Sequence, residues 1–222
     1  MNIDVDHIFI CVRSGAPEAE ALKAMGLTEG LPNKHPGQGT ANRRFFFHNV
    51  FIELLWLDDA AEAQSELTRP TMLYERLAAS NDETSPFGIC FRPAALGGNK
   101  APFPSWNYKP VYLPSNFEVE IASDIPLSEP MWFFLSFASR PDSAPQERRQ
   151  PFVHQTGFME VTSLRIVLPK IKSLSVAARS IIQSEYLSIV EGEHHLLEMG
   201  FDHEIQGRSH DFRPLLPLLF KW

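Results

Sequence analysis

The sequence has few cysteines, no long hydrophobic run and no cluster of basic residues. Its two cysteines, Cys11 and Cys90, lie in separate apolar segments, so neither a disulfide framework nor a zinc cluster is indicated. No apolar run approaches the roughly 20 residues of a membrane span, and residues 1–9 lack the charged and apolar regions of a secretory signal. We therefore expect a cytoplasmic protein that does not bind membranes.

Positive charge is outweighed by negative charge. The 27 Asp and Glu residues exceed the 20 Lys and Arg residues, which gives a formal net charge of -7 at pH 7. Such a surface repels nucleic acids and anionic lipids. The sequence also lacks the Gly-x-Ser-x-Gly turn of many serine hydrolases and the Gly-Lys-Ser/Thr signature of a phosphate-binding loop. These absences leave a small molecule as the expected partner.

The chain does have enough apolar material for a large core. Hydrophobic residues make up 44% of its 222 residues and aromatic residues 11%. Strand-like and helix-like segments alternate, which predicts an α+β fold. We divide the chain into an N-terminal βαβββ module at residues 1–58, a middle segment at residues 59–157 with additional strands and a proline-rich loop, and a C-terminal βαβββ-like module and tail at residues 158–222.

The most informative stretch is residues 44–57, which read RFFFHNVFIELLWL. Its β-branched and aromatic residues predict a hairpin that turns at His48 and Asn49. Glu53 falls in the middle of the second strand, on the same face as Phe51. A buried carboxylate needs a cation, a metal ion, hydrogen-bond donors or a proton. Glu53 is therefore the first candidate for a functional residue.

A second candidate, His7, lies in the predicted strand at residues 3–13. The period of two in a strand places His7 on the same face as Val5 and Phe9. After a short amphipathic helix, a polar loop at residues 32–42 leads into the hairpin. The predicted order up to the end of the hairpin is β, α, β, β, β.

The C-terminal residues 160–201 repeat the order β, α, β, β. When the two ends of the chain are overlaid, Glu198 falls where Glu53 stands. Ser163 falls where His7 stands, so the carboxylate recurs and the histidine does not. This pattern indicates an internal repeat with an altered second half.

These features resemble the glyoxalase-like branch of the vicinal oxygen chelate superfamily, best over residues 3–57. The residues that carry the resemblance are Asp6-His7-Ile8 in the first strand, Gly26-Leu27 after the helix, the loop at residues 35–42, and Phe51-Ile52-Glu53-Leu54 in the fourth strand. The resemblance implies paired βαβββ modules that form curled mixed sheets around a central pocket. It leaves open whether the first module pairs with the C-terminal repeat or with residues 87–138.

In metal-using members of this superfamily, the pocket holds one divalent ion that chelates vicinal oxygens of the substrate. By motif position, the resemblance implies His7 and Glu53 as ligands from the first module and Glu198 from the C-terminal module. Such a set suits zinc, iron, manganese or nickel, although three ligands are fewer than the usual set. Dimers are common in these proteins, so a homodimer is one state that the resemblance allows.

Four loop residues, His35, Gly39, Thr40 and Asn42, are candidates for substrate binding, because backbone N–H groups and short polar side chains can bind oxygens. The alternative is a turn that needs glycine and asparagine for its backbone dihedrals. A cluster at His194, His195, His203 and His210 matches no zinc spacing and is interpreted as part of a solvated strand.

Two functions fit these sequence features. The first is an isomerase, lyase or dioxygenase that acts on a small oxygenated molecule with Glu53 and His7 as catalytic residues. The second is a binding or sequestering protein on the same fold, in which no chemistry occurs. Ser163 in place of a histidine favours the second function. A third possibility is a purely structural interaction protein, which would have a filled pocket and a large apolar surface instead. For His7 and Glu53 the simplest alternative to a functional role is a satisfied buried pair.

Overall fold

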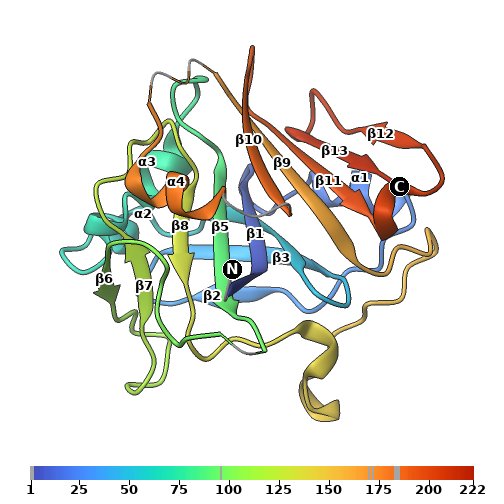
Figure 1. Ribbon diagram of the computed structural model, residues 1–222. Coiled ribbons are helices and arrows are strands. Elements are labelled where there is room, and N and C mark those ends of the chain that lie inside the picture. Colours follow the sequence, from blue (N-terminus) through green and yellow to red (C-terminus); the bar gives the residue numbers. More distant parts are fainter. Residues whose placement is uncertain (1–2, 96, 170, 172, 183–185) are drawn as a thin grey trace.

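The structure is a computed structural model that describes residues 3–95, 97–169, 171, 173–182 and 186–222. It contains two mixed β-sheets with few helices, as Figure 1 shows. The strands are β1 (Ile3–Cys11), β2 (Asn33–His35), β3 (Thr40–Phe46), β4 (Phe51–Leu57), β5 (Phe87–Pro93), β6 (Ser105–Tyr108), β7 (Val119–Ala122), β8 (Met131–Phe134), β9 (Val161–Pro169), β10 (Leu187–Gly192), β11 (Leu196–Phe201), β12 (Ser209–Asp211) and β13 (Leu218–Lys221). The helices are α1 (Ala19–Ala24), α2 (Ala60–Ala63), α3 (Leu73–Ala78) and α4 (Val176–Ile181), with short 3₁₀ turns at Arg69–Thr71, Pro141–Ser143, Gln146–Arg148 and Asp202–Glu204.

The larger sheet has eight strands in the order β2-β3-β4-β1-β5-β8-β7-β6. It consists of two halves with the same internal arrangement. In the first half β1 runs parallel to β4, and in the second half β5 runs parallel to β8. The halves join where β1 and β5 pair antiparallel. The predicted fold of paired modules in curled mixed sheets is therefore confirmed, and the middle segment supplies the partner module.

The C-terminal segment forms a separate sheet in the order β10-β9-β11-β13-β12. The predicted succession of strand, helix and two strands is present, because β9, α4, β10 and β11 follow one another. The strand neighbours differ from those of the first half, however. β9 runs antiparallel to β11, whereas β1 runs parallel to β4. The segment therefore has the predicted order of elements, but its strand pairing differs from that of the first half.

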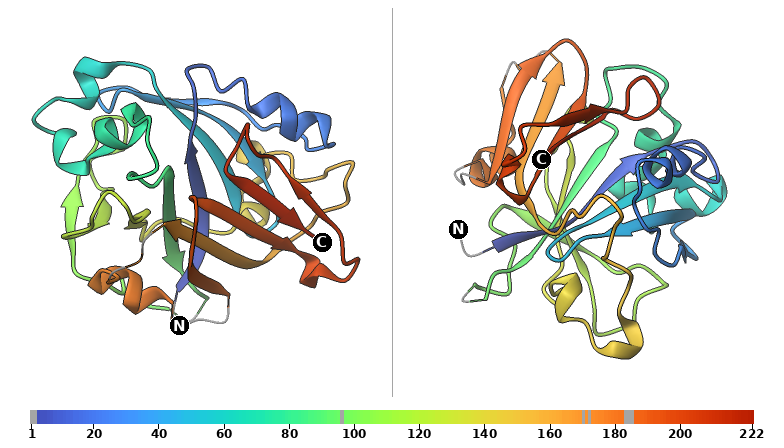
Figure 2. Two further views of the ribbon diagram at one scale, coloured as in Figure 1. Left: turned by 90° about the horizontal axis from the view of Figure 1, so that it is seen from above. Right: turned by 90° about the vertical axis from the view of Figure 1, so that its right-hand side faces the viewer.

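The main hydrophobic core lies between the two sheets. Ile8 and Ile52 from the larger sheet and Ile166 from the smaller one belong to the same buried cluster and are fully buried. Figure 2 shows the orange and red C-terminal sheet lying across the blue and green strands. Burial of each such side chain contributes roughly 1.5–3 kcal/mol. The opposite face of the larger sheet carries a smaller cluster that includes Phe9 and Leu55. Both faces are covered, as the apolar hairpin predicted.

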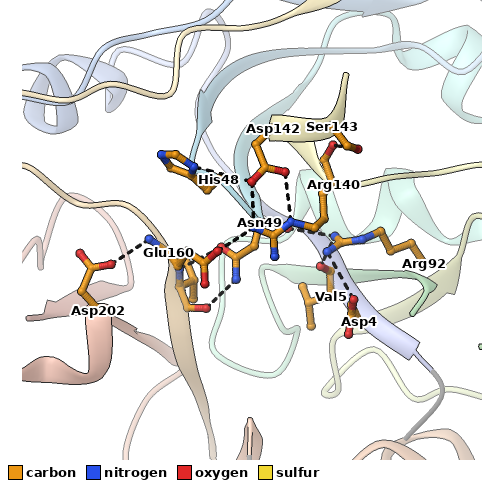
Figure 3. A network of polar contacts seen from close by, with 11 residues as sticks. Asp4, Val5, His48, Asn49, Arg92, Arg140, Asp142, Ser143, Glu160 and Asp202 are labelled. Atoms are coloured by element: carbon orange, nitrogen blue, oxygen red, sulfur yellow. Dashed lines mark hydrogen bonds and ion pairs between the residues drawn. The ribbon is translucent and has the colours of Figure 1, made fainter. Parts of the chain in front are cut away.

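Polar contacts fasten the hairpin turn to the beginning of β9 (Figure 3). The Asn49 side chain donates to the carbonyl oxygen of Val161 at 2.8 Å and accepts from its N–H at 3.0 Å. Arg92 donates to the carbonyl oxygens of Val5 and Asn49. The turn residue predicted from the sequence thus also positions the second sheet. No helix in the described ranges is long and apolar enough to cross a membrane.

Candidate functional site

A cavity of about 190 Å³ lies on the face of the larger sheet that carries Phe9 and Leu55. Its wall is divided chemically between the two halves of the sheet. The first half contributes mainly polar side chains, from His7, Asn33, His35, Gln38, Asn42, Arg44 and Glu53. The second half contributes mainly apolar ones, from Leu113, Val119, Ile121, Met131, Phe133, Leu135 and Phe137. A ligand would therefore meet polar groups on one side and hydrocarbon on the other.

His7 reaches the cavity because β1 contains a β-bulge. The pairing of β1 with β5 shifts between Val5 and His7, so the extra residue Asp6 has no partner opposite it. Beyond the bulge, His7 and Phe9 line the cavity, while Val5 belongs to the core between the sheets. The prediction that Val5 shares the face of His7 was therefore wrong, since a regular period of two does not hold across a bulge.

Asp6 fixes the orientation of the His7 ring. Its Oδ2 atom lies 2.8 Å from Nδ1 of His7, and its Oδ1 atom lies 3.6 Å from the Arg92 guanidinium. Phe51 stacks on the imidazole with 4.5 Å between ring centroids. Because Nδ1 is held by Asp6, the Nε2 atom of His7 is directed to Glu53, at 3.6 Å from its Oε2 atom.

Glu53 is held in the middle of β4, where only 6% of its surface is exposed. Asn42, on the adjacent strand β3, donates its Nδ2–H to Oε1 of Glu53. The Oδ1 atom of Asn42 accepts the backbone N–H of Asn33 at 2.9 Å, which fixes the amide orientation. Asn42 therefore occupies one carboxylate oxygen and leaves Oε2 facing His7. The structure brings His7 and Glu53 together, as we expected, and it adds Asn42, which the sequence had suggested only as a substrate-binding or turn residue.

His35 lines the cavity, whereas Thr40 is buried behind it, and the two side chains bond one another. His35 Nδ1 lies 2.8 Å from Thr40 Oγ1, which also accepts a hydrogen bond from Gln38 at 2.9 Å. Burial lowers the pKa of His35, which favours its neutral form. The ring of Tyr112 lies 4.7 Å from that of His35, and burial raises the pKa of this tyrosine.

Gly39 has a role in the turn. Its backbone N–H donates to Glu62 Oε2 at 3.1 Å, and its carbonyl oxygen accepts from Asp58 and Asp59. Its φ of 74° lies in the left-handed region that glycine adopts without strain. Since its N–H is already bonded within the protein, the turn interpretation describes Gly39 better than the substrate-binding one.

The structure does not bring Glu198 to this site. Glu198 lies on β11 in the smaller sheet, where Lys221 contacts its Oε2 atom at 2.6 Å and Arg165 at 3.7 Å. Ser163 lines a different cavity beside it. The linear overlay of the two ends therefore matched residues that belong to different sheets. Of the C-terminal histidines, His194 is exposed and pairs with Asp82 at 2.7 Å.

A resident metal ion does not fit the donor atoms at this site. Asp6, His7 and Cys90 place one ligand atom each within 4.8 Å of one another. Asp6, however, already bonds His7 and faces the Arg92 cation. Burial raises the pKa of the Cys90 thiol well above its ordinary value, and the charges of Asp6 and Glu53 add to this. The Cys90 Sγ atom already donates to the carbonyl oxygen of Phe91 at 3.6 Å.

The pair His7 Nε2 and Glu53 Oε2 provides two further donor atoms. The strand β8 and the residue after it contribute only apolar side chains to the cavity wall, namely Met131, Phe133 and Leu135. Zinc, iron and manganese sites normally have three or more protein ligands. The set is therefore incomplete, and the chemistry derived below uses no metal.

The free energy of unfolding should depend on pH, because three histidines have shifted pKa values. They are His35, His154 and His195. Burial lowers the pKa of each below the ordinary value of 6.5. Below that pH the unfolded chain binds more protons than the folded one, so the free energy of unfolding should fall as pH decreases from about 7.5 to about 5.5. Urea denaturation at several pH values checks this, and stability that is constant or rising toward acid would contradict it.

His154 offers the matched variant for that measurement. Its Nδ1 atom accepts the backbone N–H of Thr28 at 3.0 Å, and its Nε2 atom bonds the carbonyl oxygen of Phe46 at 2.8 Å. Protonation of Nδ1 would remove the acceptor for Thr28. We expect His154→Gln to be less stable at neutral pH and to lose less stability on acidification than the unmodified protein.

Two residues beside His7 and Glu53 were not proposed as site residues from the sequence. Asp6 was placed on the face opposite to His7, and the bulge brings it to the imidazole instead. Arg44 lies directly opposite Glu53 in the pairing of β3 with β4. The predicted turn at His48 and Asn49 implies this pairing, so Arg44 could have been found from the hairpin register.

Comparisons with known proteins agree with this architecture. A family model described as a glyoxalase-like domain matches residues 5–180. A crystal structure of a hypothetical protein from Staphylococcus aureus is similar with a TM-score of 0.54 and 12% identity, over 100% of this chain and 99% of that chain. A hypothetical protein from Bacillus halodurans C-125 has a TM-score of 0.41 and 16% identity, over 63% of this chain and 98% of that chain. No curated protein matches the sequence.

Proposed function

Because this chain belongs to the family of glyoxalase-like domains, we propose that it is an enzyme that moves a proton on a small carbonyl compound. In this proposal His7 and Glu53 are the acid/base pair, and no resident metal takes part. The reaction class is isomerisation or elimination next to a carbonyl group.

The observation that carries the proposal is the spacing of His7 and Glu53 at the cavity. Their Nε2 and Oε2 atoms are 3.6 Å apart, which exceeds the length of an ordinary hydrogen bond. A substrate atom beside the cavity wall can therefore lie within hydrogen-bond distance of both. Asp6 and Asn42 occupy the remaining polar atoms of the pair, which directs one nitrogen and one oxygen at the substrate.

The proton balance follows from this arrangement. In the form in which both ring nitrogens of His7 carry a proton, Nδ1 donates to Asp6 and Nε2 faces the substrate. Glu53 Oε2 removes a proton from the carbon next to the carbonyl group, while His7 Nε2 gives its proton to the carbonyl oxygen. An enol results, with Glu53 neutral and His7 neutral. Return of both protons, at the same or a neighbouring carbon, restores the enzyme.

The apolar half of the cavity supports the same reaction. Phe133 and Leu135 exclude water from the side opposite to the polar residues. In a site of low polarity, the hydrogen bond from His7 to the carbonyl oxygen, on which negative charge develops as the carbon loses its proton, is stronger than in water. General acid/base catalysis of this kind contributes roughly 10²–10⁴-fold in rate.

Solvent deuterium exchange tests the proposal without knowledge of the natural substrate. The protein is incubated in D₂O with 2-oxohexanoate and, separately, with 2-hexanone, and NMR follows loss of the protons next to the carbonyl group. We expect exchange faster than in buffer. A protein that binds these compounds but leaves their exchange rates at the buffer value would be a binding protein, and the enzyme proposal would fail.

The same assay tests metal independence. We expect purified protein to contain far less than one equivalent of zinc, iron, manganese or nickel by elemental analysis, because the donor set is incomplete. Treatment with a chelator should leave the exchange rate unchanged. Exchange that stops on chelation and returns with one added metal would overturn this part of the proposal.

A further inference from the structure

Arg44 is a cation in the cavity wall without a carboxylate bound to it. Its Nε–H donates to the carbonyl oxygen of Leu31 at 2.9 Å, and its guanidinium lies 5.2 Å from the centre of the Phe46 ring. Within the described ranges of the chain, no ion pair includes Arg44. Arg44 is half-buried, and this burial lowers the pKa of its guanidinium.

The adjacent residue Arg43, unlike Arg44, is paired with carboxylates. Its side chain points to the other side of β3 and contacts Glu29 through two nitrogens, each at 2.6 Å. It also contacts Glu20 at 2.7 Å. The chain thus supplies carboxylates for the arginine outside the cavity and leaves the one inside the cavity unpaired. A half-buried guanidinium with free N–H groups is a ready partner for a carboxylate.

Arg44 is also placed beside the reacting groups. It faces Glu53 across the antiparallel pairing of β3 and β4, so both side chains leave the sheet on the same side. No contact within 4.0 Å joins them among the described ion pairs, which leaves room for a bound group. A carboxylate on Arg44 would hold the neighbouring carbonyl carbon near the acid/base pair.

We propose that the cavity selects a carbonyl compound with a carboxylate at one end and a short apolar tail at the other, and that Arg44 binds the carboxylate. This inference rests on the proposed function, since it names the substrate class of the same site. The tail packs against the apolar half of the wall, which includes Ile121, Met131 and Phe133. Arg44 is thereby a specificity-determining residue, and Glu53 and His7 remain the reacting groups.

The test compares two probes that differ in one group. In 2-hexanone a methyl group replaces the carboxylate of 2-oxohexanoate, and the rest of the molecule is the same. We expect calorimetry to show tighter binding of 2-oxohexanoate. Arg44→Gln should weaken its binding roughly 10- to 100-fold, as loss of a charge-assisted hydrogen bond does, and leave 2-hexanone unaffected. Arg44→Lys should restore part of the affinity.

Arg43→Gln is the matched control, because it removes the same charge from the neighbouring position outside the cavity. It should not change the ratio of the two affinities. If both probes bind alike and Arg44→Gln leaves the ratio unchanged, the carboxylate inference is wrong, even if both probes exchange. If 2-oxohexanoate binds through Arg44 but neither probe exchanges, the carboxylate inference holds and the enzyme proposal fails.

Discussion

Replacement of Glu53 by glutamine should lower the rate of deuterium exchange by roughly 10²–10⁴-fold, the contribution of a positioned general base. Glutamine has nearly the same shape, so Asn42 can still donate to its side-chain oxygen. The amide cannot accept a proton at neutral pH. The loss should therefore appear in the exchange rate at saturating probe, measured by NMR, with little change in the calorimetric affinity.

Glu198→Gln is the control for this variant. Glu198 lies in the other sheet, in contact with Lys221, although the overlay of the two ends matched it to Glu53. Its replacement should leave the exchange rate within a factor of about two, because Glu198 lies in the smaller sheet and does not line the cavity that contains Glu53. Equal losses in the two variants, or an unaffected Glu53→Gln protein, would show that Glu53 is not the base.

Gly39→Ala should destabilise the fold by about 3 kcal/mol or more. A Cβ atom at this position would lie 2.1 Å from the carbonyl oxygen of Asp59 and 2.7 Å from the backbone nitrogen of Ala63. Backbone atoms cannot move aside as a flexible side chain does. The positive φ adds roughly 1–2 kcal/mol of strain, and the clash adds roughly 1–3 kcal/mol. Urea denaturation monitored by circular dichroism measures the loss.

Gly157→Ala separates the two contributions. Its φ of 77° is close to the 74° of Gly39, but a Cβ atom there would meet nothing within 4 Å. We expect a loss of about 1–2 kcal/mol, from backbone strain alone. Similar losses in the two variants would mean that the turn beside Gly39 relaxes, and that the packing of Asp59 against it contributes little.

Local sequence patterns were sufficient for the first half of the larger sheet. The run from Phe45 to Leu57 is apolar on both sides of a turn at His48 and Asn49, and the observed hairpin pairs Phe45 with Ile52 across that turn. A hairpin depends on contacts between residues close in the chain, so its register is encoded locally. The period of two along the same strand also predicted that Glu53 lies on the face of Phe51.

Contacts between segments that are distant in the chain could not be predicted from local sequence patterns. The overlay of the two ends matched Glu198 to Glu53 as a further ligand, because both follow a strand, a helix and further strands. The pairing of β1 with β5 decides which segment completes the cavity, and it joins residues more than 80 positions apart, such as Val5 and Phe91. Such pairing depends on the whole packing arrangement, which a linear repeat does not describe.

The sequence by itself determined the family, the βαβββ order of the first module, and the presence of a histidine and a carboxylate that share one cavity. Only the tertiary structure decided that Asp6 orients His7, that Arg44 stands unpaired beside Glu53, and that Glu198 lies elsewhere. The physical reason is that one bulged residue reverses the side of a strand to which side chains point. Long-range strand pairing then determines which charges can meet.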